Sequence, residues 1–149
     1  MVYVDLVGIS IFDIVLSSGA SSIIMQNHVD GKRFPIYVSN ETGTLLRDLL
    51  RKQAAKRPYT FTLLSNCITS LGATIQAIII DDTFEGIFFA KIILNNKGTL
   101  LHLDARPSDA IALALINQLP IFATQTLMQK LSWFNNIPHH PQTLGVAHP

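Results

Sequence analysis

Short apolar runs rich in β-branched residues occupy the first 38 positions and predict three β-strands. Residues 2–9 are expected to form the first strand. Residues 10–15 either extend this strand or pair with it, and a serine-rich turn follows at 17–22. Residues 23–25 lead to the hairpin dipeptide Asp30-Gly31. Residues 33–38 then run extended, because the residue before Pro35 is biased toward the β region. The chain therefore opens with a three-stranded unit.

From Asn40 the period of the pattern changes, which predicts an amphipathic helix that ends before Pro58. Ser39 or Asn40 is the expected N-cap. The apolar face carries Leu45, Leu46, Leu49 and Leu50, and basic residues occupy the other face. A second, shorter helix begins at a Thr62 cap and closes at Gly72. Its apolar residues at helical spacing are Leu64, Cys67, Ile68 and Leu71.

The second half repeats this order of elements. Strands are expected over residues 74–80, 86–94 and 99–104, separated by a turn at Asp81-Asp82-Thr83 and another at 95–98. Residues 110–115 alternate Ala with Ile or Leu and resemble a strand. We predict a helix, because Pro107 suits a first helical turn and Ala is a poor strand former. A helix with so many apolar residues should be buried nearly all round. An extended piece at 120–123 and a last helix capped by Thr126 follow.

Each half thus consists of three strands, a helix, a Pro-led extended tetrapeptide and a shorter helix. An offset of 66 residues lays Val38 on Asp104 and the pair Leu49-Leu50 on Leu115-Ile116. We therefore predict a single compact α+β domain over residues 1–134, with a mixed or antiparallel sheet made from two β3α2-like repeats and helices packed on it. The repeat would place the turns at 39–44 and 104–109 on one face of the molecule. Residues 135–149 lack periodicity and are expected to form a flexible tail.

Composition indicates a soluble protein with one core. Of 149 residues, 48% are hydrophobic, but no apolar run approaches the roughly 20 residues of a spanning helix. Asp5 and Asp13 interrupt the N-terminal apolar run, which argues against a signal peptide, so a cytoplasmic location without membrane association is expected. The single Cys67 excludes an internal disulfide and is expected to be a core thiol. The apolar composition and a possible edge strand in each half predict a homodimer or higher homo-oligomer.

Charge is segregated along the chain. Residues 32–57 contain seven basic and two acidic side chains, a net charge of +5, whereas the remainder carries −4. The basic residues include Arg47, Arg51 and Lys52, which are candidates for contact with a nucleic-acid backbone. The alternative is that the basic residues at 51–57 complement a helix C-terminus.

The stretch 103–115 carries the strongest candidate chemistry, because two acids, an Arg and a Ser precede its apolar run. If Pro107 is the first helical residue, Asp104 and Arg106 flank the helix entrance, and Ser108 and Asp109 lie in its first turn. In a functional interpretation, Asp104 and Asp109 hold a divalent cation, Mg²⁺ or Mn²⁺, and Arg106 clamps a phosphate near the free helix N–H groups. In a structural interpretation, both acids cap the helix and Arg106 bridges them.

Other polar groups are weaker candidates. His102 lies two residues before Asp104 on the same strand face, a spacing compatible with a metal or with plain solvent exposure. Asp81, Asp82 and Glu85 surround the expected hairpin turn and are interpreted as solvated turn residues. His139 and His140 fall in the expected tail. The sequence has no G-x-S-x-G, P-loop or dinucleotide fingerprint.

At residues 103–115 the sequence resembles the bifunctional nuclease family, whose recognisable segment is Asp-x-Arg-Pro-Ser-Asp-Ala followed by Ile-Ala-Leu-Ala-Leu. The matching positions are Asp104, Arg106, Pro107, Ser108, Asp109 and Ala110. Weaker likeness covers residues 34–38, 71–73, 82–90 and 120–121, so the resemblance spans roughly 2–131. It implies a compact α+β domain, often self-associating, that hydrolyses RNA and DNA phosphodiesters.

The sequence departs from the family pattern in two places. Where many members carry Thr-His-Asp-Leu after Pro58, this chain has Thr60-Phe61-Thr62-Leu63, without the His and Asp. The Gly and Glu usual after the Pro-Ile-aromatic strand are also replaced, unless Glu41 compensates. The leading hypothesis is a divergent nuclease with Asp104, Arg106, Ser108 and Asp109 as its site. The alternative is a catalytically inactive binding or regulatory module that keeps the fold.

Overall fold

The computed structural model describes residues 5–135, in which a unit of three strands and a helix occurs twice. The first unit comprises β1 (Leu6–Val15), β2 (Ser21–Asn27), β3 (Arg33–Val38) and α1 (Asn40–Leu50), and α2 (Thr60–Ser70) follows it. The second unit comprises β4 (Ala73–Phe84), β5 (Ile87–Asn96), β6 (Thr99–Ala105) and α3 (Pro107–Asn117), and β7 (Ile121–Thr124) and α4 (Gln125–Asn135) follow it. The predicted order of three strands and a helix in each half is confirmed.

All of these strands join one sheet in the order β3-β2-β1-β7-β4-β5-β6. Neighbouring strands are antiparallel except β4 and β7, which are parallel. Each unit is therefore a meander, and β7 joins the two meanders at the centre of the sheet. The predicted α+β class with a mixed sheet is confirmed.

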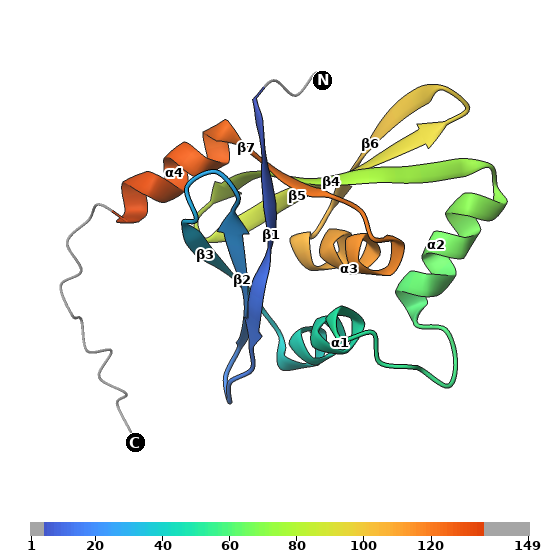
Figure 1. Ribbon diagram of the computed structural model, residues 1–149, viewed down its shortest axis with the longest axis horizontal. Coiled ribbons are helices and arrows are strands. Elements are labelled where there is room, and N and C mark those ends of the chain that lie inside the picture. Colours follow the sequence, from blue (N-terminus) through green and yellow to red (C-terminus); the bar gives the residue numbers. More distant parts are fainter. Residues whose placement is uncertain (1–4, 136–149) are drawn as a thin grey trace.

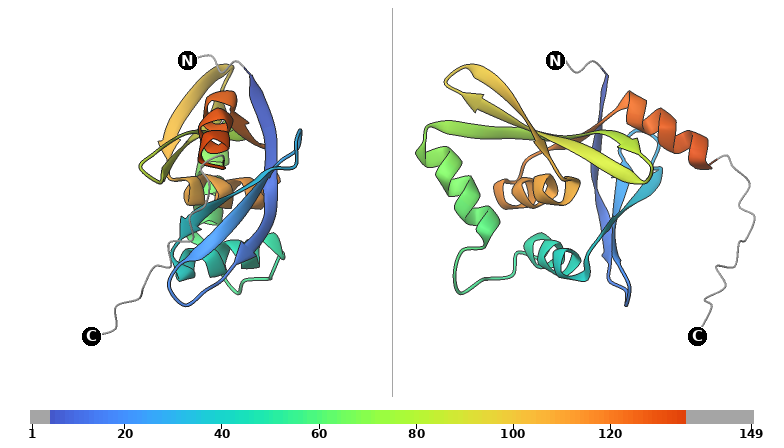
Figure 2. Two further views of the ribbon diagram at one scale, coloured as in Figure 1. Left: turned by 90° about the vertical axis from the view of Figure 1, so that its left-hand side faces the viewer. Right: turned by 180° about the vertical axis from the view of Figure 1, so that it is seen from behind.

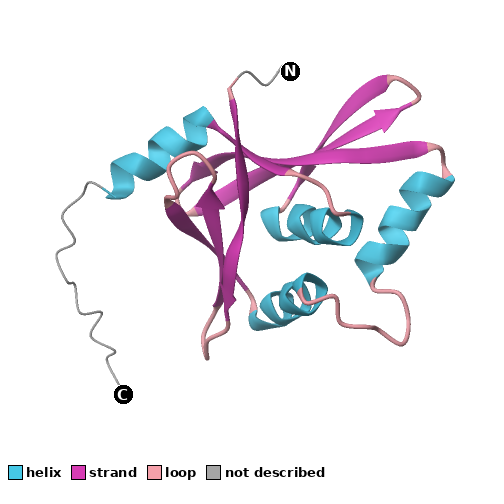
Figure 3. Ribbon diagram, viewed as in Figure 1, coloured by secondary structure: helices cyan, strands magenta, loops and turns pink. Residues whose placement is uncertain are grey.

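The sheet is strongly twisted, so that the two meanders run across each other and α3 lies in the angle between them (Figure 1). The side view in Figure 2 shows α3 between the two halves of the sheet. Figure 3 shows α1, α2 and α3 gathered together, with α4 apart from them. The twist brings β3 near β5, and the rings of Phe34 and Phe88 stack with centroids 5.9 Å apart. A groove between the two meanders follows from this arrangement.

The core is built around α3, in which residues 110–113 are fully buried. Burial of Ile111 and Leu113 contributes about 1.5–3 kcal/mol each. The alanines that alternate with them, Ala110, Ala112 and Ala114, let α3 approach its neighbours closely. The predictions of a helix, and of its burial nearly all round, are confirmed.

The first helix is shorter than predicted. α1 ends at Leu50, and Lys52 takes a left-handed conformation with φ of 53°. The backbone N–H groups of Arg51, Lys52 and Gln53 bond the last helical carbonyls and close the helix. The prediction of a helix reaching Pro58 is wrong, because a periodic pattern does not show where the backbone turns out of the helix.

The start and buried face of α2 also differ from the prediction. α2 begins at Thr60 rather than after a Thr62 cap, so the predicted extended tetrapeptide has no counterpart in the first half. Most of the expected apolar face points outward: Leu64 is 44% exposed, Leu71 80%, and Cys67 is exposed rather than a core thiol, whereas Ile68 packs against the core. Ser65 is buried instead, where its hydroxyl donates to the Asn117 side chain at 2.7 Å. α2 thus buries the face that carries Phe61, Ser65 and Ile68.

The predicted turn at Asp81-Asp82-Thr83 is wrong. β4 continues through these residues to Phe84, and the turn lies at Glu85-Gly86, where both φ angles are positive. A bulge between Ile80 and Asp82 shifts the register against β5, so β4 accommodates its polar residues without ending.

The last helix begins slightly earlier than predicted. The hydroxyl of Thr124, rather than that of Thr126, accepts a bond from the first turn of α4 at Leu127. Residues 2–4 of the first predicted strand, and 136–149 of the predicted tail with His139 and His140, lie outside the described residues. Within residues 5–135, no helix is long and apolar enough to cross a membrane.

Candidate functional site

A surface groove of about 370 Å³ lies where the strand-to-helix turns of the two units meet. Its polar end is lined by Ser39 and Thr42 at the start of α1 and by Arg106 and Ser108 at the start of α3. Its apolar side is lined by Ile36, Tyr37, Val38, Gly86, Ile87, Phe88 and Pro107. The repeat offset of 66 residues relates Thr42 to Ser108. The predicted placement of the two turns on one face is confirmed.

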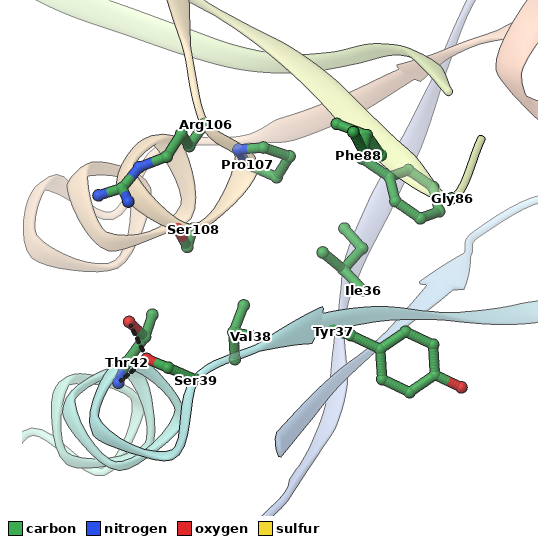
Figure 4. Close-up of a pocket in the computed structure, with 11 residues that line it drawn as sticks. Ile36, Tyr37, Val38, Ser39, Thr42, Gly86, Phe88, Arg106, Pro107 and Ser108 are labelled. Atoms are coloured by element: carbon green, nitrogen blue, oxygen red, sulfur yellow. Dashed lines mark hydrogen bonds between the residues drawn. The ribbon is translucent and has the colours of Figure 1, made fainter. Parts of the chain in front are cut away.

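On the α1 side, the groove is formed by a capped helix start. The Ser39 hydroxyl accepts a hydrogen bond from the Thr42 N–H at 3.2 Å and donates to the Thr42 hydroxyl at 2.9 Å. The predicted Ser39 cap is confirmed. Figure 4 shows the Ser108 side chain pointing from α3 toward this pair. Three hydroxyls therefore gather at one end of the groove.

On the α3 side, the helix start has no side-chain cap. Arg106 is the N-cap residue, and the buried Pro107, at the first helical position, lacks an N–H of its own. The N–H groups of the first turn and the helix dipole make this end positive. Together with the start of α1, this gives the groove two converging helix N-termini.

Arg106 and Asp109 form a bidentate ion pair across the first turn of α3. Nε donates to one Asp109 oxygen at 2.7 Å and Nη2 to the other at 3.0 Å. The hydrogen bond to Asp109 raises the pKa of the Arg106 guanidinium, whose side chain is 79% exposed. Two donor directions are thus taken by Asp109, and the rest of the guanidinium faces solvent.

Asp104 belongs to a different ion pair. Its carboxylate accepts from Lys91 Nζ at 2.7 Å, and this bond raises the pKa of Lys91. Lys91 lies opposite Asp104 in the β5–β6 register. The structural interpretation in which Arg106 bridges Asp104 and Asp109 is therefore wrong. Sequence reasoning missed Lys91, although a two-residue turn between β5 and β6 places it beside Asp104.

The carboxylates do not form a ready metal site. Asp104 and Asp109 are each held by a different cation, and neither lines the groove. Within residues 5–135, no group of three or more His, Cys, Asp or Glu side chains is arranged to hold a metal ion. A divalent cation at Asp104 and Asp109 would need both ion pairs to open, so the residues present do not fit a preformed site.

The three predicted backbone-binding residues lie away from the groove, at the other end of α1. Arg47 is in the last turn of α1, Arg51 is the C-cap, and Lys52 follows it in the loop. Lys52 lines a second pocket together with Lys56 and Arg57. The basic residues from 47 to 57 therefore do not share one helix, as the sequence had indicated.

The other polar candidates lie outside the groove. Asp82 accepts a bond from Lys130 on α4, which lowers the pKa of the Asp82 carboxyl, and a second bond from the Thr83 N–H. Glu85 lies in the β4–β5 turn. His102 lies on β6 and is half-buried. None of these side chains lines the groove.

Comparison with known proteins identifies one family. Two similar proteins are the uncharacterized protein MT1877 of Mycobacterium tuberculosis strain CDC 1551 / Oshkosh and the uncharacterized protein Rv1829 of strain ATCC 25618 / H37Rv. Each is 28% identical over 109 residues, which make up 71% of this chain and 63% of the relative. The chain thus spans less than two thirds of the length of these curated relatives. The bifunctional nuclease domain matches residues 23–136, well over half of the sequence. The chain therefore belongs to the bifunctional nuclease domain family.

Proposed function

We propose that this protein hydrolyses phosphodiester bonds of RNA or DNA at the groove between the starts of α1 and α3. The observation that carries the proposal is the convergence of two helix N-termini, three hydroxyls and Arg106 on one groove of about 370 Å³. Such an arrangement favours an anion with several oxygens, because N–H and O–H donors point at it from two elements. Family membership supports nucleic acid as the source of that anion.

In this proposal each motif residue has a separate task. The exposed part of the Arg106 guanidinium binds a phosphate oxygen, and Ser108 donates a hydrogen bond to another. Asp104 and Asp109 are the candidate base or ligands of Mg²⁺ or Mn²⁺. Because Lys91 and Arg106 hold them and neither carboxylate lines the groove, either role requires an ion pair to open, and the assay below measures whether a cation is needed.

The two positions at which the family pattern has His and Asp are Phe61 and Thr62 in this chain, and neither lines this groove. Thr62 occupies one of these positions and lines the second pocket with Leu115 and Gln118, at the far end of α3. An 11-residue helix is about 16 Å long, so a side chain there does not reach Asp104 or Asp109. This placement weakens the argument that the departure from the pattern abolishes chemistry at the motif.

The second candidate function is nucleic-acid binding without cleavage. The observation that favours it is the engagement of both motif carboxylates in ion pairs, which leaves neither free to act as a base. In that case the groove would hold a phosphate without reacting with it.

A cleavage assay separates the two functions. Purified protein is incubated with single-stranded RNA and with single-stranded DNA in EDTA, Mg²⁺ or Mn²⁺, and Asp104→Asn and Asp109→Asn are compared with wild type. Asp48→Asn on α1 is the matched control, because its carboxylate lines a different surface pocket. Removal of a catalytic acid or base lowers the rate by about 10²–10⁴-fold.

The outcomes point in different directions. Cleavage by wild type and the control, abolished in Asp104→Asn or Asp109→Asn at unchanged melting temperature, supports the nuclease. Equal cleavage by all four proteins indicates a contaminant and refutes catalysis by this site. Binding of RNA or DNA without cleavage under any cation supports the second function.

We also propose that two copies associate along β6. The two edges of the sheet differ: β3 carries Arg33 and Pro35, which discourage edge pairing, whereas β6 has neither Lys nor Pro and pairs with β5 without a bulge. Its leucines are exposed, with Leu101 at 38% and Leu103 at 43%. A second copy would cover these side chains and bond the free strand edge.

Light scattering after gel filtration tests this association. Wild type is expected to have twice the chain mass, and Leu101→Lys/Leu103→Lys to have the mass of one chain. Val29→Lys is the control, because Val29 is 82% exposed in the β2–β3 turn and this variant should still form the dimer. A single-chain mass for wild type, or a double mass for the β6 variant, would exclude this interface.

A further inference from the structure

The second pocket lies at the opposite end of α1 and α3 from the groove. It has a volume of about 430 Å³ and is bounded by the end of α1, the 51–59 loop, the start of α2 and the end of α3. Figure 1 shows α1 and α3 side by side, with the loop passing from the end of α1 to the start of α2. The repeat relates its lining residues in pairs: Leu49 matches Leu115, and Lys52 matches Gln118, both left-handed with φ of 53°. The pocket therefore lies at equivalent positions of the two repeated units.

The charged side chains that line this pocket are all basic. Lys52, Lys56 and Arg57 line it, and no Asp or Glu does. All three are exposed, and none forms an ion pair within residues 5–135. Elsewhere in the described chain, Lys91, Arg106 and Lys130 each have a carboxylate partner. The basic side chains of this pocket are thus left available for an external anion.

Capping of the neighbouring helices does not account for these cations. The last carbonyls of α1 are bonded by the backbone N–H groups of residues 51–53, and the end of α3 by the N–H of Leu119. Two helix C-termini contribute about −0.5 charge each, and the start of α2 about +0.5. Together with the three full positive charges, these partial charges leave a net charge of about +2.5. The pocket keeps a positive potential after the helix ends are taken into account.

The start of α2 adds donors to the same place. α2 has no side-chain cap and no acidic residue in its first turn, and Tyr59 and Thr62 from this turn line the pocket. Its free N–H groups and the Thr62 hydroxyl lie beside the basic side chains. Hydrogen-bond donors therefore accompany the charge, which suits an oxyanion better than a halide.

We propose that this pocket binds phosphate groups, and that these phosphates belong to the same nucleic-acid strand that lies in the groove. The part that concerns a strand rests on the proposed function. The groove and the pocket lie at the two ends of an 11-residue helix, about 16 Å apart, so one mononucleotide does not fill both. The basic pocket thus anchors a flanking part of a polynucleotide while the motif residues contact another phosphate.

The test measures binding of a labelled single-stranded RNA in EDTA, so that no cleavage is needed. The variant is Lys56→Gln/Arg57→Gln, which leaves the left-handed Lys52 unchanged. Lys32→Gln/Lys97→Asn is the matched control, because it removes the same charge at two hairpin turns outside the pocket. These four side chains are exposed, so each variant should keep the wild-type melting temperature.

The salt dependence of RNA binding gives the expected size of the loss in affinity. For single strands, the slope of log affinity against log salt decreases by about 0.7 for each phosphate that the protein no longer neutralises. The double variant should therefore show a slope smaller by about 1.4 and bind roughly 25-fold more weakly near 0.1 M salt. The control should stay close to wild type. A second arm repeats the titration with a nucleoside triphosphate to distinguish a strand from a free nucleotide.

Each result decides the proposal. Weaker RNA binding with the predicted slope assigns the pocket to the strand. Weaker triphosphate binding alone assigns it to a free nucleotide, and phosphate binding stands. Equal behaviour of variant and control in both arms overturns the proposal, and lower stability without a binding change assigns the cations to the helix ends. Because cleavage is not measured, these results are independent of the assay at Asp104 and Asp109.

Discussion

Gly43 controls how closely α1 approaches β2, and replacing it with Ala tests this packing. Gly43 is buried in α1, and a Cβ built on it would lie 2.6 Å from the Cβ and 2.8 Å from the Oγ of Ser21. Favourable carbon contacts are about 3.5–4.0 Å long. Ser21 is fully buried, so it cannot turn away into solvent. We therefore expect Gly43→Ala to push α1 about 1 Å away from the sheet.

The expected decrease in stability follows from two opposing effects. Ala is preferred over Gly in a helix by about 1 kcal/mol, which by itself would stabilise the variant. Overpacking a tight contact costs about 1–3 kcal/mol, and the upper part of this range, about 2–3 kcal/mol, applies because the Ser21 Cβ and Oγ lie only 2.6 and 2.8 Å from the new Cβ. The net expectation is a destabilisation of about 1–2 kcal/mol, or a melting temperature lower by about 2–8 °C for a domain of this size. Ser39 and Thr42 would move with α1, so the groove should widen.

Urea unfolding of a double-mutant cycle measures the effect. Ser21→Gly removes the Cβ that would clash, so the double variant Gly43→Ala/Ser21→Gly should be more stable than the sum of the two single effects predicts, by about 1 kcal/mol. Ser21→Ala keeps that Cβ and removes only the hydroxyl, which donates to Asn40 Oδ1 at 2.7 Å, and is the control. Its coupling to Gly43→Ala should be smaller.

Two results would refute this reasoning. One is a Gly43→Ala variant as stable as wild type or more stable, which would mean that helix propensity outweighs the contact. The other is additivity of Gly43→Ala and Ser21→Gly within about 0.5 kcal/mol, which would mean that the two residues do not meet.

Two further predictions concern α4 and α2. Because Lys130 lowers the pKa of Asp82, that ion pair stabilises the fold above about pH 4, and its contribution disappears as the pH falls through the lowered pKa. Both side chains are nearly half exposed, so Lys130→Met should cost at most about 1 kcal/mol at neutral pH, and urea unfolding near pH 2.5 should show a smaller difference; a difference that grows in acid would contradict this. Cys67 is exposed, so Ellman's reagent should titrate one thiol in the native protein at nearly the rate found in urea. Reaction only after unfolding would mean that Cys67 is buried.

The types of the elements could be predicted from the sequence, but their bounds, which the turns set, could not. Strand and helix types follow from side-chain period and from Pro107, which identified α3 in spite of its alternating pattern. The bounds depend on backbone conformations that ordinary residues adopt only in context, such as positive φ at Lys52, Glu85 and Lys97. The two-residue turn at Lys97-Gly98 sets the register that pairs Lys91 with Asp104. A four-residue turn, as the sequence suggested, would have paired Lys91 with His102 instead.

The motif could be located from the sequence, but its chemistry depends on distant segments. The repeat offset of 66 residues was enough to predict that the starts of α1 and α3 share one face. Because the two helices then run side by side in the same sense, their other ends must also meet, and this creates the basic pocket. A Lys on β5 determines the partner of Asp104, and the loop that follows α1 carries the cations of the pocket. Neither segment lies near the motif in sequence. The repeated helix pair therefore links the groove to the pocket, and the proposed nucleic-acid strand would lie along it from one to the other.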